Sequence, residues 1–215
     1  MRDIFTSELT ALGADLTAMS QLVEQAIDQA GNALLTADLG MAERVIAADR
    51  TIDAIERDLD ERCVLMIAQQ APVARDLRVV ISALRMSASL ERMGDLARHI
   101  AEIARLRYPA TAVPANLTAT FTSMTEAANE VAARVTEVLA SHDLELAASR
   151  ERADDRLDAL HAETFGATLG GTQQLTAQET VDVTLCARYF ERFGDHGVSV
   201  AHRVVYLVTG DFAEV

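Results

Sequence analysis

The sequence predicts an all-α protein built as two tandem, pseudo-symmetric antiparallel three-helix bundles, with six long helices in all. Half of its 215 residues are hydrophobic, yet only 4 % are aromatic, Trp is absent, and Pro (3) and Gly (10) are scarce. That composition is typical of long helices packed by small and aliphatic side chains. Apolar residues recur at spacings of three and four, the period of an amphipathic helix. An internal duplication divides the predicted helices into two sets of three.

The first half contains three predicted helices. The first spans about residues 4–35 and is ended by the segment 36–40, Thr-Ala-Asp-Leu-Gly. The second carries its apolar positions from Met41 to Met66. The third is expected to hold Pro72 in its first turn, where the missing N–H is harmless, and to run to about Arg107.

The second half repeats this plan after a linker at residues 109–114, which is bounded by two prolines. Helices are predicted over about residues 115–142 and 143–169, the latter stopping at a Gly-Gly pair. Thr176-Ala-Gln-Glu179 is a capping box that opens a sixth helix, which runs to about Val208. Because the connections are short, neighbouring helices should be antiparallel. The predicted domains are therefore residues 1–108 and 109–215.

The duplication places the same acidic pairs in each half. An offset of 105 aligns ADRTIDAI with ADDRLDAL, and an offset of 100 aligns ERMGD with ERFGD. The second helix of each half thus carries Asp-x-x-x-Asp, and the third carries Glu-Arg-x-Gly-Asp. The candidate site residues are Asp49, Asp53, Glu91 and Asp95 in the first half, and Asp154, Asp158, Glu191 and Asp195 in the second.

These pairs predict two metal sites. Residues at i and i+4 share one helix face, so four carboxylates converge wherever the two acidic faces of a half meet. Such a cluster is strongly unfavourable unless cations neutralise it. Oxygen ligands suit Mg, Ca, Mn or Fe, or zinc with carboxylates, and composition does not choose among them. Gly94 and Gly194, beside the motif Asp, would let a backbone or ligand approach closely despite a helix-propensity cost of about 1 kcal/mol. His99 and His196 are either further ligands or surface residues.

Composition also excludes several classes of protein. A net charge of −14 argues against nucleic-acid binding through a basic surface. The N-terminus lacks the apolar core of a signal peptide, and no run of about 18 apolar residues predicts membrane insertion. Cys63 and Cys186 are isolated, as expected of buried thiols in a reducing cytosol.

A tandem three-helix repeat with D-x-x-x-D on its second helix and E-R-x-G-D on its third resembles the PhoU family of phosphate-transport accessory proteins. The resemblance covers essentially the whole chain and includes Asp76-Leu77-Arg78, similar to the family's D-L-R stretch. It implies a cytoplasmic, non-catalytic protein that commonly dimerises. Its partners would be the ATPase of the phosphate ABC transporter and a sensor histidine kinase, and its role would be to repress the phosphate-starvation response.

The resemblance further implies iron or zinc clusters at the eight acidic residues named above. Four residues after each motif Asp, where the family often has Asn, this sequence has His99 and Ser199, and the second D-L-R is replaced by AQET at residues 177–180. Metal affinity or identity is therefore expected to differ between the halves.

Two alternatives stay open. One is a carboxylate-bridged metalloenzyme on a helical bundle, although such sites usually contain Glu-x-x-His, which does not occur here. The other is a metal-free helical scaffold whose acidic pairs form a charged docking face. Elemental analysis would separate the scaffold from both metal-binding hypotheses, and assays of turnover would reveal an enzyme.

Overall fold

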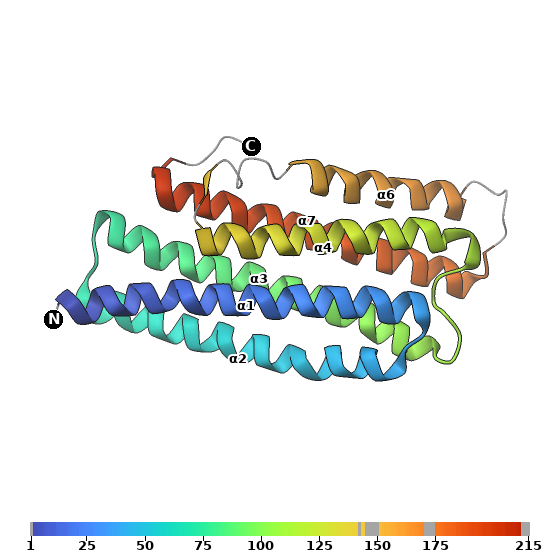
Figure 1. Ribbon diagram of the computed structural model, residues 1–215, viewed down its shortest axis with the longest axis horizontal. Helices are drawn as coiled ribbons and strands as arrows, with labels where there is room; N and C mark the ends of the chain where they lie inside the picture. The colour runs from blue at the N-terminus through green and yellow to red at the C-terminus, as the bar shows by residue number, and fades with distance from the viewer. Residues whose placement is uncertain (1, 142, 145–150, 170–174, 212–215) are drawn as a thin grey trace.

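The protein is all-α. The computed structural model describes residues 2–141, 143–144, 151–169 and 175–211, and these contain no strand. The long helices of the first half are α1 (Arg2–Thr36), α2 (Leu39–Gln70) and α3 (Ala74–Arg107). Those of the second half are α4 (Thr118–Ser141), α6 (Glu151–Leu169) and α7 (Ala177–Thr209), with a short 3₁₀ turn, η1 (Ala115–Leu117), before α4. The predicted architecture of six long helices is confirmed (Figure 1).

Local sequence sets the helix starts. Asp38 caps α2, its side chain accepting a hydrogen bond from the Met41 backbone N–H at 2.8 Å. The predicted capping box at α7 is present: Thr176 Oγ1 accepts from the Glu179 N–H at 3.1 Å, and the Glu179 carboxylate accepts from the Thr176 N–H at 2.7 Å.

One predicted helix start differs from the structure, and another falls partly outside the described residues. The expectation that Pro72 lies in the first turn of α3 was wrong. Val73 is extended (φ −128°, ψ 160°) and Ala74 has a positive φ of 48°, so Pro72 precedes the first residues of the helix, which begins at Ala74. The predicted start of the fifth helix falls partly on residues 145–150, which lie outside the described residues.

The two halves pack side by side along their full length. Within each half the three helices contact one another, and the halves meet where α1 packs on α4 and α3 packs on α7 (Figure 1). Fully buried side chains from both halves, including Met19, Leu90, Phe121 and Phe190, belong to one continuous core. The domain boundary between residues 108 and 109 stays a prediction, because hydrophobic packing continues across it.

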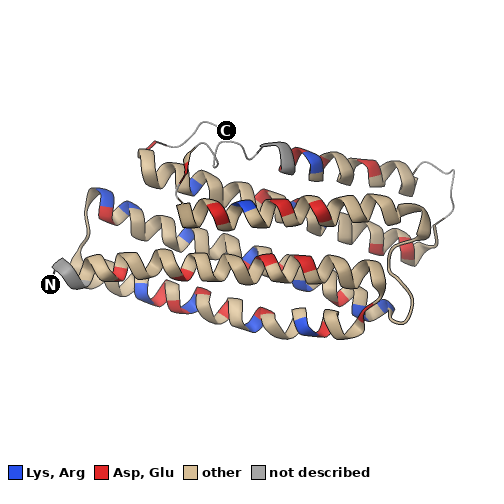
Figure 2. Ribbon diagram, viewed as in Figure 1, with Lys and Arg blue, Asp and Glu red and all other residues tan. Residues whose placement is uncertain are grey.

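A buried ion pair joins the two halves near one end of the α3–α7 contact. Arg107 donates through Nε to Asp182 Oδ2 at 2.5 Å and through Nη2 to Oδ1 at 2.9 Å, and Asp182 is only 4 % exposed. Elsewhere charged residues lie on all six long helices (Figure 2). None of the described helices has an apolar stretch long enough to cross a bilayer.

Candidate functional site

Each glycine of the E-R-x-G-D motifs faces the acidic pair of the neighbouring helix. Gly94 on α3 is buried, and a Cβ there would lie 2.9 Å from Ile52 Cδ1 and 3.5 Å from Asp49 Oδ1 of α2. A Cβ on Gly194 of α7 would overlap Asp154 Oδ1 and lie 3.0 Å from Leu157 Cδ1 of α6. The absent side chains therefore let the helices approach until the first Asp of the acidic pair reaches the glycine backbone.

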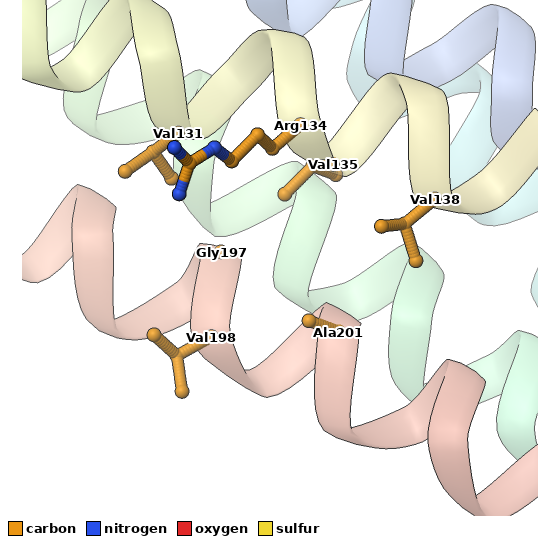
Figure 3. A pocket seen from close by; sticks show the side chains of 7 residues that line it. All are labelled: Val131, Arg134, Val135, Val138, Gly197, Val198 and Ala201. Carbon is orange, nitrogen blue, oxygen red and sulfur yellow. The ribbon is translucent and has the colours of Figure 1, made fainter. Parts of the chain in front are cut away.

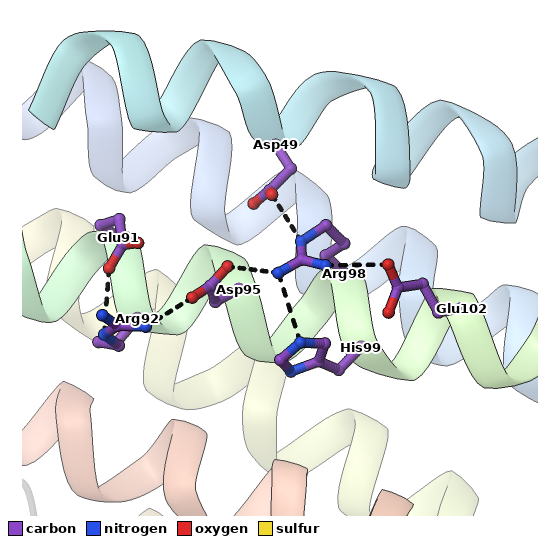
Figure 4. Close-up of polar contacts among 7 residues, drawn as sticks. All are labelled: Asp49, Glu91, Arg92, Asp95, Arg98, His99 and Glu102. Carbon is purple, nitrogen blue, oxygen red and sulfur yellow. Dashed lines mark hydrogen bonds and ion pairs between the residues drawn. The ribbon is translucent and has the colours of Figure 1, made fainter. Parts of the chain in front are cut away.

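In the first half an arginine lies between the acids. Arg98 contacts Asp49 Oδ2 through Nε at 2.7 Å, and its Nη2 donates to Asp95 Oδ1, also at 2.7 Å (Figure 4). Its Nη1 donates to Glu102 Oε1 at 2.9 Å. Burial opposes the charge of this guanidinium, but hydrogen bonds to Asp95 and Glu102 and the charge of Asp49 outweigh it and raise the Arg98 pKa. Arg98 is thus a permanent cation between α2 and α3.

A second arginine, Arg92, pairs with two of the acids of the first half. Arg92 Nη1 donates to Asp95 Oδ2 at 2.8 Å, and Arg92 Nε lies 3.3 Å from Glu91 Oε2 (Figure 4). Burial raises the pKa of Asp49; Arg98 opposes this rise, and the neighbouring charges of Asp53 and Asp95 add to it. The four predicted acids of this half therefore lie within electrostatic reach of one another, with two arginines among them.

The second half lacks the central arginine. At the offset of 100, Arg98 corresponds to Val198, whose side chain accepts and donates no hydrogen bonds. Arg188 forms an ion pair with Glu191 Oε1. Asp154 Oδ1 and Glu191 Oε2 are buried without a hydrogen-bond partner in the described structure. Asp49 Oδ1 of the first half is also buried without a partner, but Arg98 contacts the other oxygen of that carboxylate, whereas none of the described side chains forms an ion pair with Asp154.

Electrostatics reflect this difference. The pKa of Asp154 is raised to about 6, first by burial and then by the charges of Asp158 and Asp195. The pKa of Glu191 is also raised, by burial and by Asp195, with Arg188 opposing the rise. Burial and the neighbouring negative charges destabilise the ionised form of both carboxyl groups, and a bound cation would reduce that destabilisation.

The second half is therefore the better fit for a metal ion. Buried, unpartnered carboxylate oxygens are suitable donors for hard or borderline cations, whereas the first half already holds the Arg98 guanidinium between its acids. Among the side chains that the structure describes, no three carboxylate, histidine or cysteine groups stand close enough to hold a metal as they are. The metal sites stay a prediction.

Sequence reasoning missed the cations around the acids. Arg98 lies three residues after Asp95 and four before Glu102, and both spacings place side chains together on a helix, so its role could have been anticipated. His161 of α6 is close enough to Glu191 for its charge to oppose the rise in the pKa of that carboxyl. That contact crosses from α6 to α7, so it could not be predicted from sequence spacing.

A further pocket, between α4 and α7, is apolar except for Arg134. Gly197 lets α7 approach Val131 of α4, and the remaining space of about 20 Å³ is lined mostly by valine and alanine (Figure 3). Such a space holds about one water molecule and offers it few polar partners. It is a packing feature of the two helices.

Comparison with known proteins places the chain in one family. The family model described as "PhoU domain" matches residues 16–104 and 121–204. A relative from Mycobacterium tuberculosis, "Phosphate-specific transport system accessory protein PhoU homolog 2", is 40 % identical over 212 residues, covering 99 % of this chain and all of the relative. "PhoU homolog 1" of Mycobacterium leprae is 38 % identical and covers 100 % of this chain and 96 % of its own. These relatives are named as accessory proteins, not enzymes.

Solved structures agree with the sequence comparisons. The crystal structure of PhoU from Pseudomonas aeruginosa matches with a TM-score of 0.86 at 29 % identity, covering 96 % of this chain and all of that one. The phosphate transport system regulatory protein PhoU from Streptococcus pneumoniae also gives 0.86, at 25 % identity and 98 % coverage of this chain. The similarity therefore extends over the whole chain in both sequence and fold.

Proposed function

Because the chain belongs to the PhoU family, we propose that it is a cytoplasmic regulator of phosphate uptake and signalling that acts by docking and not by catalysis. The observation that carries this proposal is the full-length similarity to proteins named as phosphate-specific transport system accessory proteins. Its partners would be the ATPase of the phosphate ABC transporter and a sensor histidine kinase. Through them it would repress the phosphate-starvation response, acting as a homodimer.

The charge of the protein supports docking on basic surfaces. The chain has a net charge of −14 and a cluster of four acidic residues in each half, so it would attract basic patches on a partner protein. The affinity for such a partner would fall as the salt concentration rises. A cation bound among the acids would reduce that attraction locally, so metal occupancy and partner affinity would be linked.

We propose further that a divalent or trivalent metal, iron or zinc first among them, binds the second half in preference to the first. The orphaned oxygens of Asp154 and Glu191 support this choice. In the first half Arg98 supplies the compensating charge, so the metal-free hypothesis is favoured there. When bound, the metal would neutralise the carboxylates and hold α6 against α7.

Elemental analysis of protein purified without chelators tests the metal. We expect bound metal in the wild type and its loss in Asp154→Ala, while Asp49→Ala, the equivalent change in the first half, leaves the metal content unchanged. Absence of metal from the wild type, or equal loss in both variants, would contradict the preference for the second half.

Affinity measurements test the docking. The ATPase and the kinase domain should bind the wild type with an affinity that changes on metal removal, and Glu191→Gln should alter that dependence. Glu61→Gln removes one exposed acid of α2 and serves as the charge-matched control. The regulatory role is wrong if neither partner binds in any metal state and a deletion strain lacking a second copy still represses phosphate-starvation genes.

A further inference from the structure

A cluster of basic side chains lies at the seam where α3 packs on α7. It lines a pocket of about 300 Å³ and comprises Arg92 and His99 of α3 with Arg188, Arg192 and His196 of α7. Asp95 is the acidic group in the same wall. Three guanidinium groups gathered from two helices repel one another, and this arrangement is unexpected in a chain with a net charge of −14.

Arg192 is the clearest member of this cluster. It is exposed, and no ion pair is recorded for it with any described side chain. It lies four residues after Arg188 on the same helix face, where two like charges destabilise the helix by a few tenths of a kcal/mol. Arg192 is also the repeat counterpart of Arg92, so the duplication has placed an arginine on each side of the seam.

The other two arginines keep donor capacity toward the pocket. Arg92 pairs with Asp95 and Glu91, and Arg188 pairs with Glu191, but their side chains are 60 % and 50 % exposed. A guanidinium has five N–H donors, so one or two carboxylate contacts do not exhaust it. An anion in the pocket could therefore be reached without breaking either ion pair.

His99 lines the same wall of the pocket. Arg98 Nη2 lies 3.3 Å from His99 Nε2, and because a guanidinium only donates, Nε2 must be the acceptor (Figure 4). The neutral ring then carries its proton on Nδ1, which is buried and has no hydrogen-bond partner in the described structure. The ring packs toward α7, with its centroid 5.2 Å from that of Tyr189.

Basic residues predominate on the α7 side of the pocket. Arg188 and Arg192 line it there beside His196, and the acidic member of the lining, Asp95, comes from α3. A negative group at this side would therefore meet two guanidinium charges.

We propose that this pocket at the α3–α7 seam binds a phosphoryl group or an equivalent divalent oxyanion. Arginine forks suit tetrahedral oxyanions because their donors lie in one plane and bind two oxygens at once. About 300 Å³ is the lower limit of common small-molecule sites, so the pocket fits an inorganic oxyanion or the phosphoryl end of a larger ligand. This inference goes beyond the docking function and depends on neither partner nor metal.

Calorimetric titration with inorganic phosphate, at constant ionic strength and without metal, tests it. We expect saturable binding to the wild type and at least a tenfold loss of affinity in Arg192→Gln, since a charge-assisted hydrogen bond is removed. Arg44→Gln removes an exposed arginine of α2 that lines neither this pocket nor the acidic groups, and should bind as the wild type does. Parallel titration with adenosine monophosphate separates the two sources of a phosphoryl group: tighter binding than inorganic phosphate indicates the larger ligand.

Imidazole resonances give a second measurement that locates the ligand. Phosphate should shift the ring signals of His99 and His196 in the wild type but not those of His202, which is described and does not line the pocket. The proposal is overturned if neither phosphate nor adenosine monophosphate binds saturably, if Arg192→Gln and Arg44→Gln lose affinity equally, or if binding leaves both seam histidines unshifted.

Discussion

Replacing Asp154 by asparagine should stabilise the metal-free protein at neutral pH. The Asp154 carboxyl has a pKa raised from 3.8 to about 6, mainly by burial. Each pKa unit corresponds to about 1.4 kcal/mol, so a shift of about two units means that the ionised Asp154 carboxylate lowers the free energy of unfolding by roughly 3 kcal/mol. Solvent screening at this partly buried site reduces the expected gain to about 2–3 kcal/mol. Asparagine loses no hydrogen bond at Oδ1, which has none.

The sign of the pH dependence follows from the direction of the shift. A raised carboxyl pKa means that the folded state holds its proton more tightly, so between about pH 4 and pH 6 the wild type loses stability as pH rises. The asparagine variant lacks this loss. Its advantage should be absent near pH 4 and complete above about pH 7.

Urea denaturation in chelator, followed by circular dichroism at pH 4.5 and pH 7, measures the effect. Asp49→Asn is the matched variant in the first half and should gain less, because Arg98 already offsets part of the cost of ionising Asp49. Adding metal should make the wild type more stable than Asp154→Asn, because only the wild type would bind the metal. A variant less stable than the wild type at pH 7 in chelator would refute the argument that Asp154 ionises at a cost.

Four further substitutions test the packing and charge of the helices. Gly194→Leu should lower the free energy of unfolding by about 1–3 kcal/mol through overpacking against α6. Gly166→Ala is the control: this glycine of α6 faces open space, so the change should raise the free energy of unfolding by about 0.5–1 kcal/mol. Equal effects of the two substitutions on urea denaturation would contradict the close contact at Gly194. Arg98→Val copies the second half, and should lower the stability of the metal-free protein and add a metal equivalent by elemental analysis; unchanged content would show that Arg98 does not exclude a cation. Asp182→Asn should lower the Tm by weakening the ion pair between the halves, and an unchanged Tm would show that this pair contributes nothing to stability.

The sequence by itself determined the helices and the positions of the acids. Periodic apolar residues, the Thr176 capping box and the duplication are local signals, and local signals are what helix starts and faces depend on. The same reasoning placed Gly94 and Gly194 at close approaches between helices, because a glycine in a helix interior needs a reason that outweighs its propensity cost.

Only the tertiary structure decided how the charges are compensated. Both halves carry the same acidic pattern, yet Arg98 bridges α2 and α3 in one, and no equivalent bridge exists at Val198 in the other. Whether a side chain on one helix reaches a carboxylate on the next depends on the interhelical distance and on rotamers, which no spacing in the sequence encodes. The cationic pocket at the α3–α7 seam depends in the same way on packing between the two halves, so residues such as Arg92 and Arg192, one hundred positions apart, meet only after the chain has folded.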